Sequence, residues 1–298
     1  MAPLGYYPGC SDHGSGCELG MSVHALANLA GVELREIEDW NCCGATAAHN
    51  LSHDLAVALP YRVLALAEAQ GLKEVLTPCA ACYSRLKGTV IRLSRSPELL
   101  AKMREIAGLE YRGPLTIVNV VEFVNRLLAG GLKDKLTSPL AGLKVAPYYG
   151  CLLLRPAEEL RFDDPERPTI LENFLKSIGC EVVDFPHKTE CCGSFVTVGS
   201  PETARECSSS ILEAAVKQGA EMLVVSCPLC QYNLDRAQRE APAGQAHAPA
   251  VPVLYFSQLL AIALGCDEAC LHLDGLSVDP RPRLSKWLGQ KAEVTALA

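Results

Sequence analysis

The chain has 298 residues, 49% of them hydrophobic and 20% charged, so it can bury a core and is long enough for two domains. Its net charge is −7, and no basic stripe alternates with aromatic residues, which argues against a nucleic-acid partner. The first residues lack a signal-peptide pattern. The longest apolar stretch, residues 251–264, is too short and too polar for membrane insertion. We therefore expect a cytoplasmic protein.

Short strands and helices alternate along the first part of the chain, and each strand leads to a cysteine motif. Strands are expected within residues 4–10, 32–37 and 74–77, and helices over 22–30 and 55–70. The motifs that follow these strands are Cys10, Cys42-Cys43-Gly44 and Cys79-Ala-Ala-Cys82. Both helices end at a glycine, which is a common helix stop.

The same order of elements recurs in the second part of the chain. Strands are expected within residues 144–151, 181–185 and 221–226, and helices over 170–178 and 202–218. The motifs that follow are Cys151, Cys191-Cys192-Gly193 and Cys227-Pro-Leu-Cys230. The repetition predicts two pseudo-symmetric halves, residues 1–142 and 143–298, and residues 240–249 are expected to form a loop.

Alternating strands and helices favour an α/β fold in which each half is a small parallel sheet with covering helices. The carboxyl ends of parallel strands lie along one edge of the sheet, where ligands bind. Because every cysteine motif follows a strand, the five motif cysteines of each half are expected to converge at one such edge.

Fifteen cysteines in a reducing compartment favour metal ligation over disulfides. A structural zinc ion needs four ligands, and each half offers five thiols. A cubane [4Fe–4S] cluster also takes four cysteines, and the ferredoxin pattern Cys-x2-Cys-x2-Cys is absent. Five thiols with an adjacent pair therefore indicate an iron–sulfur site with unusual ligation, and the spacing alone leads no further.

Other residues near the motifs are weaker candidates. His187 and Lys188 precede the second cysteine pair, where they could donate a proton or stabilise a thiolate, and we treat them as candidate catalytic residues. Loop roles are the simpler interpretation for His13 and His49. The five cysteines outside the motifs divide into three expected packing residues and one pair at helical spacing; they are Cys17, Cys180 and Cys207, then Cys266 and Cys270.

The duplicated cysteine pattern resembles the CCG cysteine-rich domain, and residues 4–265 as a whole resemble the B subunit of heterodisulfide reductase. The resemblance implies two non-cubane [4Fe–4S] clusters, each held by the five motif cysteines of one half. The first set is Cys10, Cys42, Cys43, Cys79 and Cys82, and the second is Cys151, Cys191, Cys192, Cys227 and Cys230. It also implies a mixed-disulfide substrate between the clusters, a ferredoxin-like iron–sulfur C subunit and a flavin-containing A subunit as partners.

The leading hypothesis is therefore the catalytic iron–sulfur subunit of a multi-subunit thiol–disulfide oxidoreductase. The alternative is an electron-transfer subunit of a flavin- or quinone-linked oxidoreductase or of a sulfur-oxidising complex, because the same domain occurs in quinone-linked oxidoreductases. A structural zinc module is a third interpretation, which metal analysis would decide.

Overall fold

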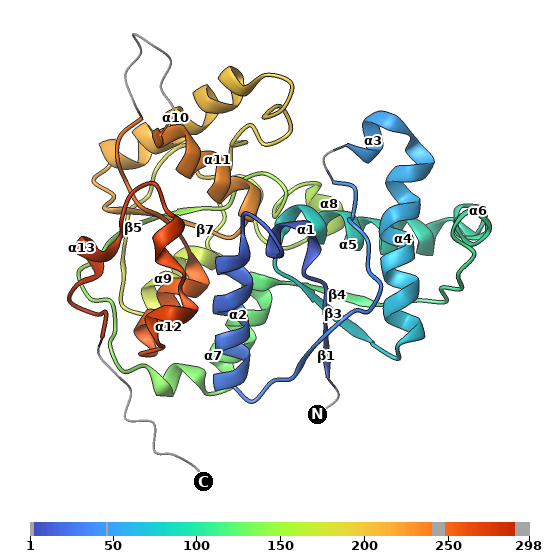
Figure 1. The fold of residues 1–298 in the computed structure, drawn as a ribbon, viewed down its shortest axis with the longest axis horizontal. Helices are drawn as coiled ribbons and strands as arrows, with labels where there is room; N and C mark the ends of the chain where they lie inside the picture. The colour runs from blue at the N-terminus through green and yellow to red at the C-terminus, as the bar shows by residue number, and fades with distance from the viewer. Residues whose placement is uncertain (1–2, 46, 240–247, 290–298) are drawn as a thin grey trace.

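A computed structural model describes residues 3–45, 47–239 and 248–289 of the chain (Figure 1). Most of the loop expected at 240–249 lies outside these residues. The described part contains two four-stranded sheets, and every strand pair in them is parallel. The predicted α/β fold with two repeats is confirmed.

The two sheets have the same strand order, β2-β1-β3-β4 and β6-β5-β7-β8. The first comprises β1 Leu4–Tyr6, β2 Leu34–Glu36, β3 Glu74–Thr77 and β4 Thr116–Asn119. The second comprises β5 Lys144–Tyr148, β6 Glu181–Val182, β7 Met222–Val225 and β8 Val253–Tyr255. Strands β5, β6, β7 and β8 of the second sheet thus correspond to β1, β2, β3 and β4 of the first.

Helices connect these strands and cover the sheets. Those of the first half are α1 Gly9–Asp12, α2 Cys17–Leu29, α3 Ala48–Leu51, α4 His53–Ala69, α5 Ala80–Arg95, α6 Pro97–Ala107 and α7 Val120–Ala129. Those of the second are α8 Ala157–Leu160, α9 Ile170–Ser177, α10 Pro201–Lys217, α11 Pro228–Arg239, α12 Phe256–Ala263 and α13 Arg281–Leu284. Short 3₁₀ turns lie at η1 Leu132–Lys135, η2 Glu268–Cys270 and η3 Leu273–Gly275.

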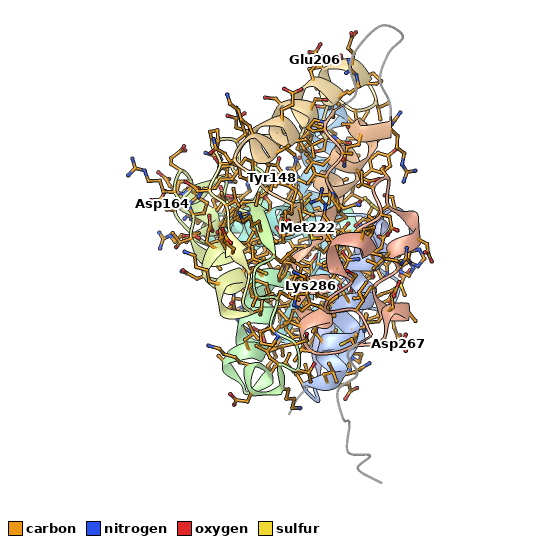
Figure 2. The ribbon with its side chains drawn as sticks, turned by 90° about the vertical axis from the view of Figure 1, so that its left-hand side faces the viewer. Tyr148, Asp164, Glu206, Met222, Asp267 and Lys286 are labelled. Carbon is orange, nitrogen blue, oxygen red and sulfur yellow. The ribbon has the colours of Figure 1, made fainter. Side chains whose placement is uncertain are left out.

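Burial explains why the central strands form where they do. All four residues of β7 are buried, as expected for a parallel strand covered by helices on both faces. Figure 2 shows Tyr148 and Met222, from the paired strands β5 and β7, in the interior of the second half. The exposed side chains of Asp164, Glu206 and Asp267 lie at its periphery (Figure 2).

The two halves pack against each other through helices. Figure 1 shows α2 of the first half beside α12 of the second, with α7 next to α2. The buried hydroxyls of Ser22 and Ser257 lie 2.7 Å apart across the α2–α12 contact. One apolar core continues through both halves. The division into two cluster-binding domains, residues 1–142 and 143–298, stays a prediction.

Candidate metal centre

The six cysteine motifs all lie just beyond the carboxyl ends of strands. Cys10 follows β1, the first Cys-Cys pair follows β2, and Cys79 separates β3 from α5. The second half repeats this placement after β5, β6 and β7. Each set of five therefore gathers at the carboxyl edge of its own sheet, as the parallel topology predicts.

In the first half, the five thiols form one connected cluster. The sulfur atoms of Cys43 and Cys82 are 3.3 Å apart. The sulfur of Cys42 accepts hydrogen bonds from the thiols of Cys10 and Cys43 and from the backbone N–H of Gly44. These bonds lower the pKa of Cys42, and the bond from Cys10 has the largest effect. The pKa of Cys10 is raised by its hydrogen bond to Cys42 and by burial. Cys42 is thus the thiol of this set that is most easily deprotonated.

The second half reproduces this arrangement with equivalent residues. The sulfur atoms of Cys192 and Cys230 are 3.6 Å apart. Hydrogen bonds from Cys151 and Cys192, together with the backbone N–H of Gly193, lower the pKa of Cys191. The first cysteine of each adjacent pair therefore has the same electrostatic environment in both halves.

The two thiol sets meet at the interface between the halves. A hydrogen bond to Cys227 raises the pKa of the fully buried Cys79 thiol. Hydrogen bonds from Cys230 and Cys79 lower the pKa of Cys227. The sequence patterns predicted one thiol-rich edge in each half, but they gave no sign of which cysteines would touch between the halves.

Two buried tyrosines hold the backbone in front of the adjacent pairs. The hydroxyl of Tyr7 donates to the carbonyl of Asn41 at 2.8 Å, and that of Tyr148 donates to the carbonyl of Glu190 at 2.7 Å. Each carbonyl belongs to the residue directly before a cysteine pair. The repeated tyrosine three residues before each lone cysteine was the signal that could have revealed this role.

The backbone also approaches the sulfur atoms closely, as a thiolate-rich metal site requires. Gly9 and Gly150 both have φ of +66°, and a Cβ atom on either would lie 3.0 Å from the sulfur of Cys82 or Cys230. Cys43, Cys79 and Cys82 are nearly fully buried. Cys10, Cys42 and Cys191 are exposed, so each set has a buried side and a side open to solvent. Closely spaced thiols of this kind fit an iron–sulfur group.

The two candidate catalytic residues have other partners in the structure. Nδ1 of His187 lies 2.8 Å from Oε1 of Glu190. Nζ of Lys188 lies 2.8 Å from carboxylate oxygens of both Glu172 and Asp184. The backbone carbonyl of Lys188 accepts a hydrogen bond from Tyr149 N–H at 2.9 Å. These contacts favour a structural role for Lys188, and the catalytic role of both residues stays a prediction.

Of the other two histidines near the cysteine motifs, His13 contacts residues of its own half and His49 contacts the second half. His13 stacks on Trp40, and its Nε2 lies 3.6 Å from Glu36. His49 makes an edge contact with Phe195 at 5.9 Å, so the chain beyond the first cysteine pair touches the chain beyond the second. Sequence reasoning missed this contact because its two residues are far apart in the chain.

The cysteines outside the motifs are not equally buried. Cys180 lies in the core as expected, and burial raises its pKa to about 12. Cys17 and Cys207 are only partly buried, so the expected packing role fits them less well. Cys266 and Cys270 interact through their thiols around η2.

Together, the fold and the thiol sets define a duplicated, cysteine-rich α/β protein. The sequence profile of the CCG cysteine-rich domain matches residues 4–87 and 145–235. A solved structure of a hypothetical protein from Helicobacter pylori has the same fold, with a TM-score of 0.75 at 16% identity over 93% of this chain and 52% of that one.

Several relatives match most of the chain. The 8-methylmenaquinol:fumarate reductase membrane anchor subunit of Wolinella succinogenes is 35% identical over 92% of this chain and 96% of its own length. The B subunit of the ferredoxin:CoB-CoM heterodisulfide reductase of Methanosarcina mazei is 33% identical over 83% of this chain and 84% of its own. The chain belongs to the family of heterodisulfide reductase B subunits, which carries the duplicated CCG domain.

The name of the Wolinella relative mentions a membrane anchor. Among the described residues of this chain, no helix has the length and apolar character needed to span a bilayer.

Proposed function

We propose that this chain is the disulfide-handling iron–sulfur subunit of a heterodisulfide reductase-like oxidoreductase. The observation that carries the proposal is the pair of matched five-thiol sets that meet through Cys79 and Cys227. We propose that each set holds one non-cubane [4Fe–4S] cluster. One zinc ion in each set would bind four of its five thiols and leave the fifth without a metal bond. A fifth cysteine is present in both halves, which favours a group that uses all five.

Two clusters would match the electron count of the reaction. Cleaving a disulfide consumes two electrons and two protons and gives two thiols, and an iron–sulfur cluster supplies one electron at a time. The chain's own contribution is to hold the two thiol sets at adjoining sheet edges and to bury the Cys-x-x-Cys thiols of each set. We propose that a small disulfide binds between the loops beyond the two cysteine pairs, where His49 contacts Phe195.

Protons for the departing thiolates need a donor near the cysteine pairs. We propose His187 for this role, because histidine is a common proton donor in catalysis and the residue lies four positions before Cys191. Its Nδ1 lies 2.8 Å from Oε1 of Glu190 without forming a hydrogen bond, so this nitrogen has no hydrogen-bond partner among the described residues. The contacts of Lys188 with Glu172 and Asp184 hold the same loop in place.

The relatives are named as subunits of larger enzymes, which supports assembly with other chains. We propose a ferredoxin-like iron–sulfur C subunit and a flavin-containing A subunit as partners, in a cytoplasmic complex. The fumarate reductase relative favours one alternative, an electron-transfer subunit of a quinone-linked enzyme.

Metal analysis and a redox titration test the proposal. Protein purified without oxygen should contain about eight irons and eight acid-labile sulfides per chain. Adding a small mixed disulfide to the reduced complex should oxidise both clusters, as followed by electron paramagnetic resonance. Stoichiometric zinc without iron would overturn the proposal. If a menaquinone analogue oxidises the reduced clusters and no disulfide does, the electron-transfer alternative is established instead.

A further inference from the structure

A second group of metal-binding side chains lies outside the ten-cysteine edge. The thiol of Cys17, a carboxylate oxygen of Glu18 and a ring nitrogen of His272 all lie within 4.8 Å of one another. Cys17 and Glu18 begin α2 in the first half, whereas His272 lies between η2 and η3 in the second. The group therefore bridges the two halves.

One carboxylate oxygen of Glu18 is buried without a hydrogen-bond partner. Glu18 is only 9% exposed, and its Oε2 makes no hydrogen bond to any described residue. A buried carboxylate oxygen without a partner costs about 1–3 kcal/mol or more. A bound cation would remove this cost.

Buried neighbours hold the backbone on either side of the three residues, although the side chain of His272 itself is exposed and that of Cys17 is half-buried. His272 lies between Leu271 and Leu273, which are 0% and 2% exposed. The carbonyl of Leu271 accepts a hydrogen bond from Nε2 of Gln258 at 2.6 Å. On the other side, Leu19 follows Glu18 in α2 and is buried. The backbone that carries the three ligand residues is thus held in place before any metal arrives.

We propose that Cys17, Glu18 and His272 bind one divalent transition-metal ion, with zinc as the favoured metal. Zinc accepts sulfur, imidazole nitrogen and carboxylate oxygen together, whereas magnesium and calcium require oxygen ligands. Binding deprotonates the Cys17 thiol and releases one proton to solvent. In a tetrahedral zinc site the ligand atoms are about 3.5 Å apart, so small side-chain shifts close the group around the ion.

Three protein ligands leave the fourth position of the metal open. Glu18 also lines a hollow of about 460 Å³, together with Ser15, Asp235, Arg239 and Gly275. A water molecule from this hollow can supply the fourth ligand. The metal would connect α2 to the chain after α12, next to the packed hydroxyls of Ser22 and Ser257.

Metal analysis combined with anomalous X-ray scattering tests the site in the iron-loaded protein. We expect about one zinc per chain and an anomalous peak at the zinc edge between Cys17 and His272. Cys17→Ser and His272→Ala should each reduce zinc at least fivefold and leave the iron content unchanged. Cys207→Ser and His53→Ala are matched controls, because they alter a partly buried cysteine and an exposed histidine elsewhere.

Two results would overturn the proposal. One is wild-type protein that lacks an anomalous peak at this position after dialysis against zinc. The other is an undiminished zinc content in both variants. The scattering experiment uses wild-type protein, so it decides the question even if a variant fails to fold. A failure here leaves the iron–sulfur proposal untouched, because that proposal concerns iron at the ten motif cysteines.

Discussion

At the residue scale, the glycine after each cysteine pair sets the course of the backbone. Gly193 has φ of +83°, and a Cβ atom there would lie 2.7 Å from Cα of Ala204. Its N–H also donates to the sulfur of Cys191 at 3.4 Å. A side chain at this position would therefore strain the backbone and push α10 away from the thiol set.

We predict that Gly193→Ala lowers the free energy of unfolding by about 1–3 kcal/mol and reduces iron bound in the second half. Urea unfolding and iron analysis measure the two effects. Gly199→Ala is the matched control, since nothing lies within 4 Å of a Cβ atom there and its φ is not positive. Equal stability of the two variants would show that α10 readily moves aside.

At the scale of elements, Lys188 joins the loop before the second cysteine pair to α9. Its partner Glu172 is nearly buried on α9 and also accepts a hydrogen bond from the hydroxyl of Tyr149. Burial lowers the pKa of Lys188, but hydrogen bonds to Asp184 and Glu172 outweigh burial, and the net shift is upward. The folded state thus holds this proton more tightly than the unfolded state.

This shift gives a prediction for alkaline pH. A raised lysine pKa contributes stability below the unfolded value of about 10.4, and the contribution disappears as pH rises through the folded value. We predict that Lys188→Met lowers the free energy of unfolding at pH 8 by about 1–3 kcal/mol and flattens its decline above pH 10. Denaturant unfolding at several pH values measures both effects.

Lys102→Met serves as the control for Lys188→Met. Lys102 makes an exposed ion pair with Asp54, and such pairs contribute about 0–1 kcal/mol. Disulfide turnover by folded Lys188→Met protein separates the structural role from the catalytic one. Complete loss of turnover with both clusters intact would establish Lys188 as catalytic.

The partners of Lys188 also mark where sequence reasoning stops. The strand-then-cysteine order predicted two thiol-rich edges, because parallel strands end on the same side of a sheet. Glu172 lies 16 residues before Lys188 in the chain, and no local pattern connects the two. The contact between Cys79 and Cys227 likewise depends on how α2 packs on α12, which a periodic pattern within either helix does not specify.

At the scale of the whole molecule, the matched sets predict two separable sites. We predict that Cys42→Ser removes about half of the iron and Cys192→Ser removes the other half, because serine oxygen is a poor substitute for a soft thiolate. Iron analysis and paramagnetic resonance distinguish the two losses. Cys180→Ser, which alters a buried cysteine outside the motifs, controls for the removal of a thiol as such. Loss of all iron from either motif variant, in folded protein, would require one shared site.

The contact between Cys79 and Cys227 also has a consequence for the lifetime of the protein. Neighbouring thiols that lose their metal in the presence of oxygen can oxidise to disulfides. Because thiol contacts run from Cys43 through Cys82 and Cys79 to Cys227, oxidation of one thiol set exposes the other half to cross-linking. Such a molecule would be covalently locked across its interface, and reinsertion of iron would first require a reductant. The arrangement that brings the two thiol sets together therefore also links the oxidation of one set to that of the other.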